Sequence, residues 1–353
     1  MGRTLRIASG KTLTATPVFD SYWRFAAARQ ALFMRRIQGD PPPWTSDKII
    51  AAHRFTNTYR AADRVSQYLI RHVIYTGLPN AEEVFFRTIL FKLFNRIDTW
   101  ELLVDRLGET PNWRGFNVER YARILDAAYA SGKRLYSAAY IMPSPPFGNE
   151  RKHRNHLQLL DCMMRDGAPG KVGRALSLEE VFKALREYPS LGDFLAFQFA
   201  IDLNYSEFVD FPEADFVVAG PGARDGIAKC FSNTSSLTEA EIIAHVAMIA
   251  DEEFDRLGLQ FHKLGGKRPL QLIDCQNLFC EVDKYARVAH PEFSGESGRT
   301  RIKQKFSANY AALPQFYPPK WELNDSVAAA RTSFSTGVSR ASQISLSFVH
   351  PAD

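Results

Sequence analysis

The chain has 353 residues, of which 45% are hydrophobic and 24% are charged, as in ordinary globular proteins. This composition excludes wholesale disorder and fibrous repeats, and the length allows one large domain or two smaller ones. The net charge of +5, from 44 Lys and Arg against 39 Asp and Glu, permits a polyanionic partner but does not require one.

Cysteine, histidine and apolar spacing exclude several further classes. The four cysteines form no CxxC pair and the eight histidines show no ligand pattern, so we expect reduced thiols, no metal and no cofactor. No stretch approaches the ~20 apolar residues of a membrane span, and the first residues lack the apolar core of a signal peptide. We therefore expect a soluble, cytoplasmic protein with no membrane partner.

Apolar periodicity predicts a mostly α protein. The predicted helices, in chain order, cover residues 20–37, 46–76 (as one or two helices), 81–97, 98–107, 117–131, 177–188, 190–203, 237–257 and 270–285. Asn80 is suited to cap the helix at 81, and Ser177 with Glu180 and Thr238 with Glu241 match the capping-box pattern.

The remaining segments are predicted to be irregular, except for one modest strand candidate at 213–219. Residues 143–156 are predicted to form a basic loop or linker, and the chain from about 320 a Ser-rich irregular tail. We expect an N-terminal extension at 1–45, a two-lobed helical domain at 46–318 and the tail at 319–353.

The first motif that suggests chemistry is VVAGPGARDGI at 217–227, where apolar residues precede Gly220, Gly222 and Gly226. Glycines at the start of a helix can expose successive backbone N–H groups to a phosphate, with Arg224 and Lys229 adding positive charge. A plain turn between two helices explains the same pattern.

The second motif lies in LIDCQNLFCEVDKY, where Asp274, Asn277, Glu281 and Lys284 are spaced to share one face of a helix. Such a face could perform acid and base chemistry on a nucleobase or sugar. The alternative is a solvated face on which Glu281 and Lys284 pair with each other.

The third motif is RTILFKLFNRIDTW at 87–100, in which Asn95 follows an aromatic and aliphatic run. A buried amide needs a hydrogen-bond partner, which would suit a binding role. A helix-terminal asparagine before the Asp98 turn is the alternative.

Together these pieces resemble the helix-hairpin-helix DNA glycosylase superfamily. More closely, the chain is similar to the branch of the α-glutamyl/putrescinyl-thymine pyrophosphorylases, which includes the helical domain found with hydroxymethyluracil-DNA kinases. The matching pieces are FTNTYRAADRVSQYL, FRTILFKLFNRIDTWELL, FLAFQFAIDLNYSEF, AGPGARDGI and CQNLFCEVDKYAR. The resemblance implies a two-lobed helix-hairpin-helix glycosylase-like fold with base flipping.

The resemblance also implies roles for individual residues. Asp274 takes the position of the catalytic aspartate, with Glu281 and Asp202 as alternatives and Lys284 beside Glu281. The residues expected to read the base are Asn95, Gln276, Asn277, Asp202 and Tyr285. Those expected to contact the DNA backbone are Gly220, Gly222, Arg224, Gly226, Lys229 and Arg87. Arg224 replaces the lysine of bifunctional members, and a guanidinium cannot form their Schiff base.

The expected function is therefore a monofunctional glycosylase that excises a bulky modified pyrimidine from double-stranded DNA, in phage modification or in defence against phages. The first alternative is a transferase that replaces pyrophosphate on an activated 5-hydroxymethyl pyrimidine with an amino acid or polyamine. The second is a module that binds modified DNA without chemistry. The sequence has no P-loop, so this chain is not expected to be a kinase itself.

Overall fold

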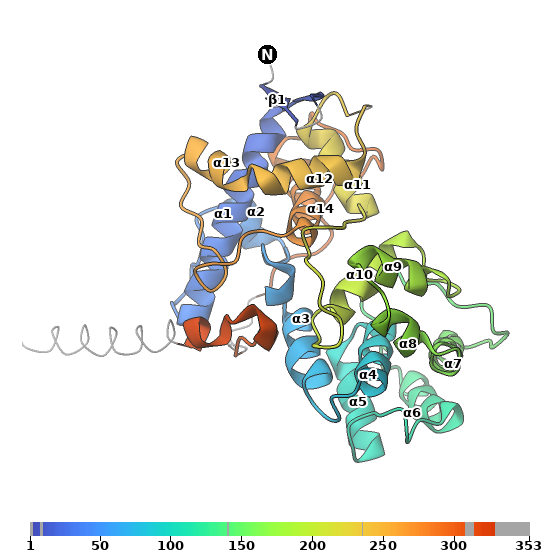
Figure 1. Cartoon of the computed structure of the whole chain (residues 1–353). Helices are drawn as coiled ribbons and strands as arrows, with labels where there is room; N and C mark the ends of the chain where they lie inside the picture. The colour runs from blue at the N-terminus through green and yellow to red at the C-terminus, as the bar shows by residue number, and fades with distance from the viewer. Residues whose placement is uncertain (1–2, 8–9, 140, 235, 308–313, 329–353) are drawn as a thin grey trace, which may run out of the picture.

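The computed structural model describes residues 3–7, 10–139, 141–234, 236–307 and 314–328. It is mostly helical, as predicted, and its helices form two lobes (Figure 1). We call residues 60–203 the central lobe. The terminal lobe combines the helices on either side of this range, from the beginning and from the last third of the sequence. No described helix is long and apolar enough to cross a membrane.

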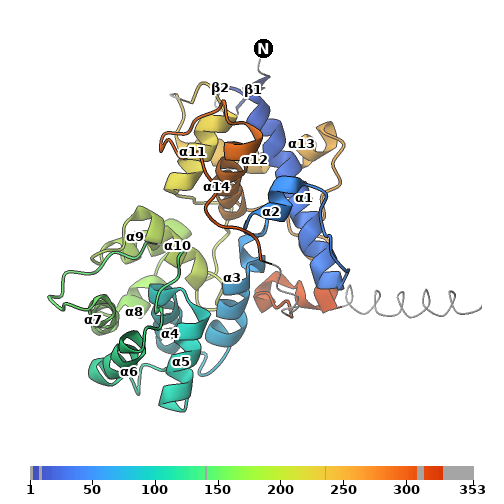
Figure 2. The same ribbon diagram turned by 180° about the vertical axis from the view of Figure 1, so that it is seen from behind.

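The terminal lobe is built around α1 and α14, as both views show (Figures 1 and 2). Its elements are β1 (Thr4–Arg6), β2 (Thr12–Thr14), α1 (Pro17–Gln38), α2 (Lys48–Ala52), α11 (Pro221–Cys230), α12 (Glu239–Met248), α13 (Ala250–Arg256) and α14 (Leu272–Ala289). The two short strands pair antiparallel, with Leu5 opposite Leu13.

The first helix belongs to the core of this lobe. Thr16 caps α1 and Pro17 opens it, an arrangement that suits a helix start. Its buried aromatic rings pack on distant elements: the Tyr22 ring lies 4.7 Å from the Phe279 ring of α14. Packing therefore continues across the predicted boundary at residue 45, and the expected N-terminal extension supplies a central helix.

The central lobe follows the chain from η1 to α10. Its elements are η1 (Arg60–Ala62), α3 (Arg64–Tyr68), the π-helix η2 (Leu69–Ile74), α4 (Ala81–Phe94), α5 (Ile97–Leu107), α6 (Val118–Ala130), α7 (Lys152–Arg165), α8 (Ala168–Gly173), α9 (Leu178–Arg186) and α10 (Asp193–Leu203). Helices α4 and α10 are apolar on nearly all sides and are buried among the others, as that pattern requires.

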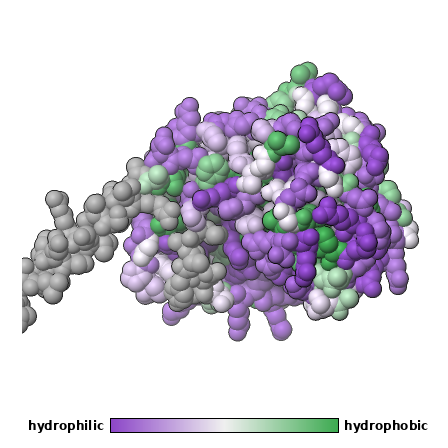
Figure 3. Space-filling view, turned by 90° about the horizontal axis from the view of Figure 1, so that it is seen from below, coloured by the Kyte–Doolittle hydropathy of each residue, from purple (hydrophilic) through white to green (hydrophobic). Residues whose placement is uncertain are grey.

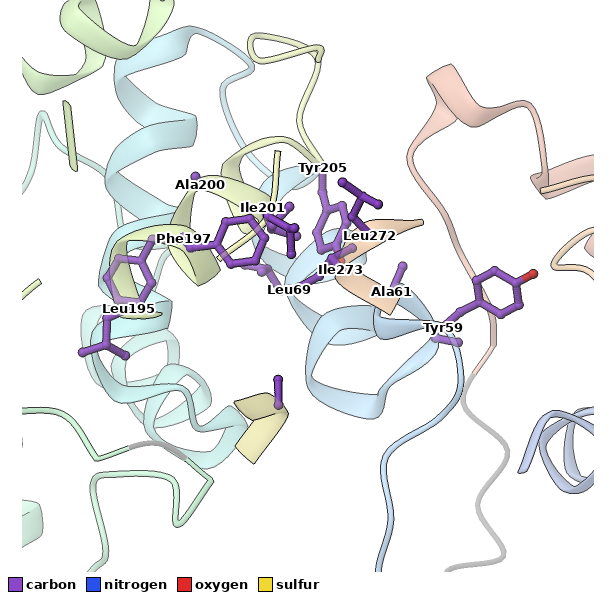
Figure 4. Packing of buried hydrophobic residues seen from close by; sticks show 14 of the residues in the cluster. Tyr59, Ala61, Leu69, Leu195, Phe197, Ala200, Ile201, Tyr205, Leu272 and Ile273 are labelled. Carbon is purple, nitrogen blue, oxygen red and sulfur yellow. The ribbon is translucent and has the colours of Figure 1, made fainter. Parts of the chain in front are cut away.

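The lobes meet where the start of α14 packs against η1 and the end of α10. Leu272 and Ile273 lie beside Ala61 and Tyr205 in this contact (Figure 4). The junction is thus made by the N-terminal turn of α14, which carries Asp274.

The local predictions succeed mainly at helix ends. The side chains of Asn80, Ser177 and Thr238 cap their helices, and the capping box between Thr238 and Glu241 is complete. The strand predicted at 213–219 is wrong, because these residues form a connection without regular structure. The basic segment 143–156 is a loop only up to Arg151; α7 begins at Lys152.

Residues 314–328 cross the junction and contain η3 (Pro319–Trp321). Lys320 donates to the carbonyl oxygens of Ser206 and Val209, at 2.8 and 2.7 Å. The Trp321 ring contacts the Tyr205 ring edge to face. The guanidinium carbon of Arg268 lies over the Trp321 ring, 3.6 Å from its centre. Phe316 N–H also donates to Gln67 Oε1 of α3 at 2.8 Å, so this segment contacts both lobes. Most of the tail predicted at 319–353 lies outside the described residues.

Candidate functional site

Asp274 lies at the junction of the lobes, at the start of α14. Its carboxylate accepts one hydrogen bond from the backbone N–H of Arg60 at 2.8 Å and another from that of Gln271 at 3.0 Å. Burial raises the pKa of Asp274 to about 7, because the loss of water outweighs these two hydrogen bonds. Asp274 thus braces its own helix and η1 against each other.

Glu281 and Lys284 lie further along the same face of α14. Glu281 Oε2 accepts from Lys284 Nζ at 2.6 Å and from the backbone N–H of Thr56 at 3.1 Å. The Glu281–Lys284 pair was expected under the alternative of a solvated helix face. That alternative is correct only in part, because Glu281 is buried against the loop at 55–63. Asn277 is half-buried between Asp274 and Glu281, and its amide has no hydrogen bond within the described part of the chain.

The loop at 55–63 adds polar groups that the sequence interpretation did not identify as functional. Asn57 N–H donates to Asp63 Oδ1, and Arg29 Nη2 donates to Asn57 Oδ1, both at 2.7 Å. Burial raises the pKa of Asp63 to about 7. Within the described ranges, Thr56 Oγ1 and Arg29 Nη1 are buried without a hydrogen-bond partner. The only sequence signal was that FTNTYRAAD belongs to one of the matching pieces.

These groups form one site at the edge of the junction, which we call the junction site. It comprises Thr56, Asn57 and Asp63 from the loop together with Asn277, Glu281 and Lys284 from α14. Tyr285 stays outside it, since its hydroxyl donates to Asp47 at 2.8 Å and its ring packs on Phe25.

Asp202 lies in the interior of the central lobe. Its two carboxylate oxygens contact Arg60 Nη1 at 2.8 Å and Lys92 Nζ at 3.0 Å, and all three side chains are almost completely buried. Burial lowers the pKa of Lys92, while Asp202 acts in the opposite direction. This charged group is linked to the junction through Arg60, whose backbone binds Asp274.

Asn95 belongs to the same interior network. It ends α4 in the left-handed conformation, with φ of 47°, and its Oδ1 accepts from Lys92 Nζ at 2.8 Å. The helix-terminal alternative is therefore correct for its backbone. Gln276 is also buried, and its amide nitrogen lies 3.2 Å from Cys280 Sγ. Neither side chain is open to a base in this structure.

The glycine corner is used for helix packing. A Cβ atom at Gly226 would lie 2.1 Å from the carbonyl oxygen of Phe279, and one at Gly222 would lie 3.2 Å from Cys280 Sγ. At Gly220 it would meet the Phe194 ring at 2.7 Å. The contacts at Gly222 and Gly226 let α11 lie directly against α14, and the contact at Gly220 brings the corner against Phe194 of α10. The phosphate contact of these glycines stays a prediction.

Two of the cations assigned to the DNA backbone are inside the protein. Lys229 is buried and pairs with Asp283 at 2.8 Å, while Arg87 donates to the carbonyl oxygens of Val73 and Leu78, each at 2.9 Å. Neither can reach a phosphate without leaving these partners. Arg224 is exposed near Glu239 and remains a predicted backbone contact.

The described residues contain no group of three or more His, Cys, Asp or Glu side chains that could hold a metal ion. The side chains of the junction site are carboxylates, amides, a hydroxyl and an ammonium group.

Comparisons with known proteins place this architecture in a family. The family model described as "5-hmdU DNA kinase, helical domain" matches residues 16–295, from the residue before α1 to beyond the end of α14. A 5-hmdU DNA kinase of Bacillus phage SP10 is 27% identical over 294 residues, which cover 77% of this chain and 45% of that protein. This chain thus spans less than half the length of that relative, and no solved structure matches.

These matches contradict the expected excision of a base, since the relative is a kinase and not a glycosylase. A hydrolase acting on the N-glycosidic bond is therefore the wrong enzyme class. The helix-hairpin-helix relationship stays a prediction, whereas the resemblance to the kinase-associated helical domain is confirmed. The chain belongs to the family of the 5-hmdU DNA kinase helical domain.

Proposed function

We propose that this chain holds DNA containing 5-hydroxymethyl-deoxyuridine and presents the hydroxymethyl group for phosphorylation by a separate nucleotide-binding domain or protein. The observation that supports this most strongly is the family match over residues 16–295, which includes both lobes and the whole junction site. The phage relative, which carries the same helical region in a longer chain, is named for that reaction.

The sequence supports assigning the phosphoryl transfer itself to another domain or protein. It contains no GxxxxGK[ST] motif, which in P-loop enzymes cradles the phosphates of a nucleoside triphosphate. Phosphoryl transfer depends mainly on positioning and on electrostatic stabilisation of the phosphates, so a partner would have to supply those parts. This chain would supply the positioned acceptor hydroxyl.

The junction site has suitable groups for an extruded pyrimidine. The amide of Asn277 is half-buried, has no hydrogen-bond partner among the described residues, and can donate to and accept from the edge of a base. The hydroxyl of Thr56 also has no partner among them but is buried, so a base would have to uncover it first. Enzymes that act on a base within duplex DNA take it out of the stack and read it in this way. Glu281 and Lys284, which pair with each other on the same face of α14, would contact the hydroxymethyl oxygen or the neighbouring phosphate.

The test is binding of the purified chain to two duplexes that differ only in thymidine or 5-hmdU at one position. We expect tighter binding of the 5-hmdU duplex by fluorescence anisotropy, because a site with unpaired polar groups rewards the extra hydroxyl. Asn277→Ala should reduce this preference about tenfold, equivalent to ~1.4 kcal/mol.

Gln260→Ala is the matched control, since Gln260 is an exposed amide in the connection after α13. It should leave both affinities unchanged. Equal binding of the two duplexes by the wild-type chain would overturn the proposal, as would phosphorylation of the DNA by this chain and ATP alone.

A further inference from the structure

A basic segment follows α14 and takes no part in the junction site. Residues 299–305 read RTRIKQK, with cations at every second position. Arg299, Arg301, Lys303 and Lys305 are exposed, while Ile302 between them packs against the core. We call this segment the basic ribbon. It lies beyond residue 295, where the family match ends.

The ribbon is held in place by backbone contacts at both ends. Arg287 of α14 donates from Nη1 to the carbonyl oxygen of Arg301 at 3.0 Å. At the other end, Arg54 N–H donates to the carbonyl oxygen of Gln304 at 3.0 Å, and Phe306 N–H to that of Ala52 at 3.0 Å. The last two bonds form an antiparallel bridge between His53 and Lys305. None of the three bonds involves a basic side chain of the ribbon.

This anchoring places the ribbon beside the junction site. Its partner segment at 52–54 leads directly to Thr56, whose backbone binds Glu281. Two further exposed cations, Lys48 and Arg54, lie on or next to α2 in the same region. Figure 2 shows the chain after α14 passing α2 toward α3.

The charge of this region is not neutralised inside the protein. In the described ranges of the chain, the four ribbon cations, Lys48 and Arg54 form no ion pair. Two acidic groups close in sequence have other partners: Asp47 accepts from Ile49, Ile50 and Tyr285, and Glu292 lies 3.6 Å from His290. A third, Glu296, is exposed three residues before Arg299 and forms no ion pair among the described residues. Figure 3 shows the molecule as a whole from below, where hydrophilic residues predominate between separate hydrophobic patches.

A row of exposed, unpaired cations on a fixed backbone suits a phosphate chain. Alternate residues of an extended segment lie ~6.6 Å apart, so the four cations can follow successive phosphates of one strand. Phosphate contacts position a protein on DNA without reading its sequence. The core of a protein–protein interface is instead depleted of charged residues, whereas the outward side chains of the ribbon are almost all charged or polar.

We propose that the basic ribbon, with Lys48 and Arg54, binds the phosphate backbone of DNA and positions the duplex over the junction site. The identity of the bound DNA rests on the proposed function, but the ribbon's contacts are independent of the modified base. The ribbon therefore contributes affinity for any duplex, whereas the junction site contributes the preference for 5-hmdU.

The experiment compares the wild-type chain with R299Q/R301Q/K303Q/K305Q on duplexes containing either thymidine or 5-hmdU. Anisotropy titrations are run from 50 to 200 mM salt, the range over which phosphate contacts lose affinity. We expect the variant to bind both duplexes about 10- to 100-fold more weakly at the lowest salt, with its dependence of log K on log salt reduced by ~3. The preference for 5-hmdU should be unchanged.

The control R114Q/K133Q/R134Q/R174Q removes the same charge from exposed positions of the central lobe. It should retain most of the affinity, and R299K/R301K should bind like the wild type. Circular dichroism and thermal melting check that each variant is folded.

The proposal is overturned if the ribbon variant keeps the wild-type affinity and salt dependence, or if the control variant loses as much affinity. If the wild-type chain binds both duplexes equally but the ribbon variant still loses affinity, the proposed function fails and the ribbon assignment stands.

Discussion

Arg60 and Lys92 in the central lobe and Arg299 and Lys303 on the ribbon are the same kinds of group in opposite surroundings. The first two are almost completely buried, and each contacts Asp202 at 3.0 Å or less. The other two are exposed and form no ion pair among the described residues. The comparison separates cations that hold the fold together from cations that are available to a partner.

This difference also explains why a net charge of +5 says little about DNA binding. The buried basic residues Lys92, Lys229, Arg60 and Arg87 all point into the protein, where carboxylates or backbone carbonyls receive them. What matters for a polyanion is the local density of unpaired charge, which the ribbon provides.

The largest expected effect comes from removing the carboxylate at the centre of the buried group. Asp202→Asn leaves Arg60 and Lys92 without a counter-ion, and we expect a loss of about 3–5 kcal/mol in the free energy of unfolding. Urea denaturation measures it. Asp251→Asn, which breaks the exposed pair with Lys263, should lose less than ~1 kcal/mol. Similar losses for the two variants would remove the distinction between buried and exposed charges.

A second prediction tests whether the glycine corner is an interior contact or a surface one. In Gly226→Ala the added Cβ would collide with the backbone of Phe279, which cannot rotate away, so stability should fall by about 1–3 kcal/mol.

Gly173→Ala is the matched control for this glycine, because it lies in a helix with open space around its Cα. It should be neutral or stabilising by up to ~1 kcal/mol. A Gly226→Ala protein that unfolds like the wild type, yet binds DNA weakly, would favour a phosphate contact at this corner instead.

The third prediction concerns the dependence of stability on pH. Asp274 has a folded-state pKa of about 7, above the ordinary value of 3.8, so the folded protein holds a proton that the unfolded chain releases. Its contribution to stability is present at low pH and is lost as the pH rises toward 7. Compared with Asp274→Asn, the wild-type chain should lose at most ~1.4 kcal/mol per pH unit between pH 5 and 7.

Urea denaturation of both proteins at each pH checks this slope, and the comparison cancels the titration of all other groups. If the difference in unfolding free energy between the two proteins does not change with pH, Asp274 is ionised over the whole range despite its burial.

The sequence predicted features that depend on neighbours along the chain. Caps such as Asn80 and Thr238 act on the next turn of the same helix, so a short window contains all the information needed. The contacts among Arg60, Lys92 and Asp202 depend on how α4 and α10 pack against η1. The sequence around each of these residues does not indicate that they meet. The strand predicted at 213–219 also depended on distant residues, and in the part of the chain that the structure describes no strand pairs with it.

The functional interpretation shows a related limit. The pieces that carry the resemblance identified the kinase-associated helical family correctly, but the chemistry was taken from the wider superfamily. A shared fold does not determine the reaction, and the glycosylase hypothesis failed at this step. Of the residues named from the sequence, Asn277, Glu281 and Lys284 meet at the junction site, while Asn95 and Asp202 are interior.

Trp321 and Lys320 hold residues 314–328 against the rest of the protein, and this limits where the chain can be truncated. A truncation placed after residue 295, where the family match stops, would remove the ring that covers Arg268 and the side chain of Leu323, which packs on Gly265. It would also uncover Tyr205, the residue whose hydroxyl receives Arg60. A shortened version would therefore lose these contacts at the junction together with the basic ribbon at 299–305, and weak DNA binding by it would not distinguish the two losses.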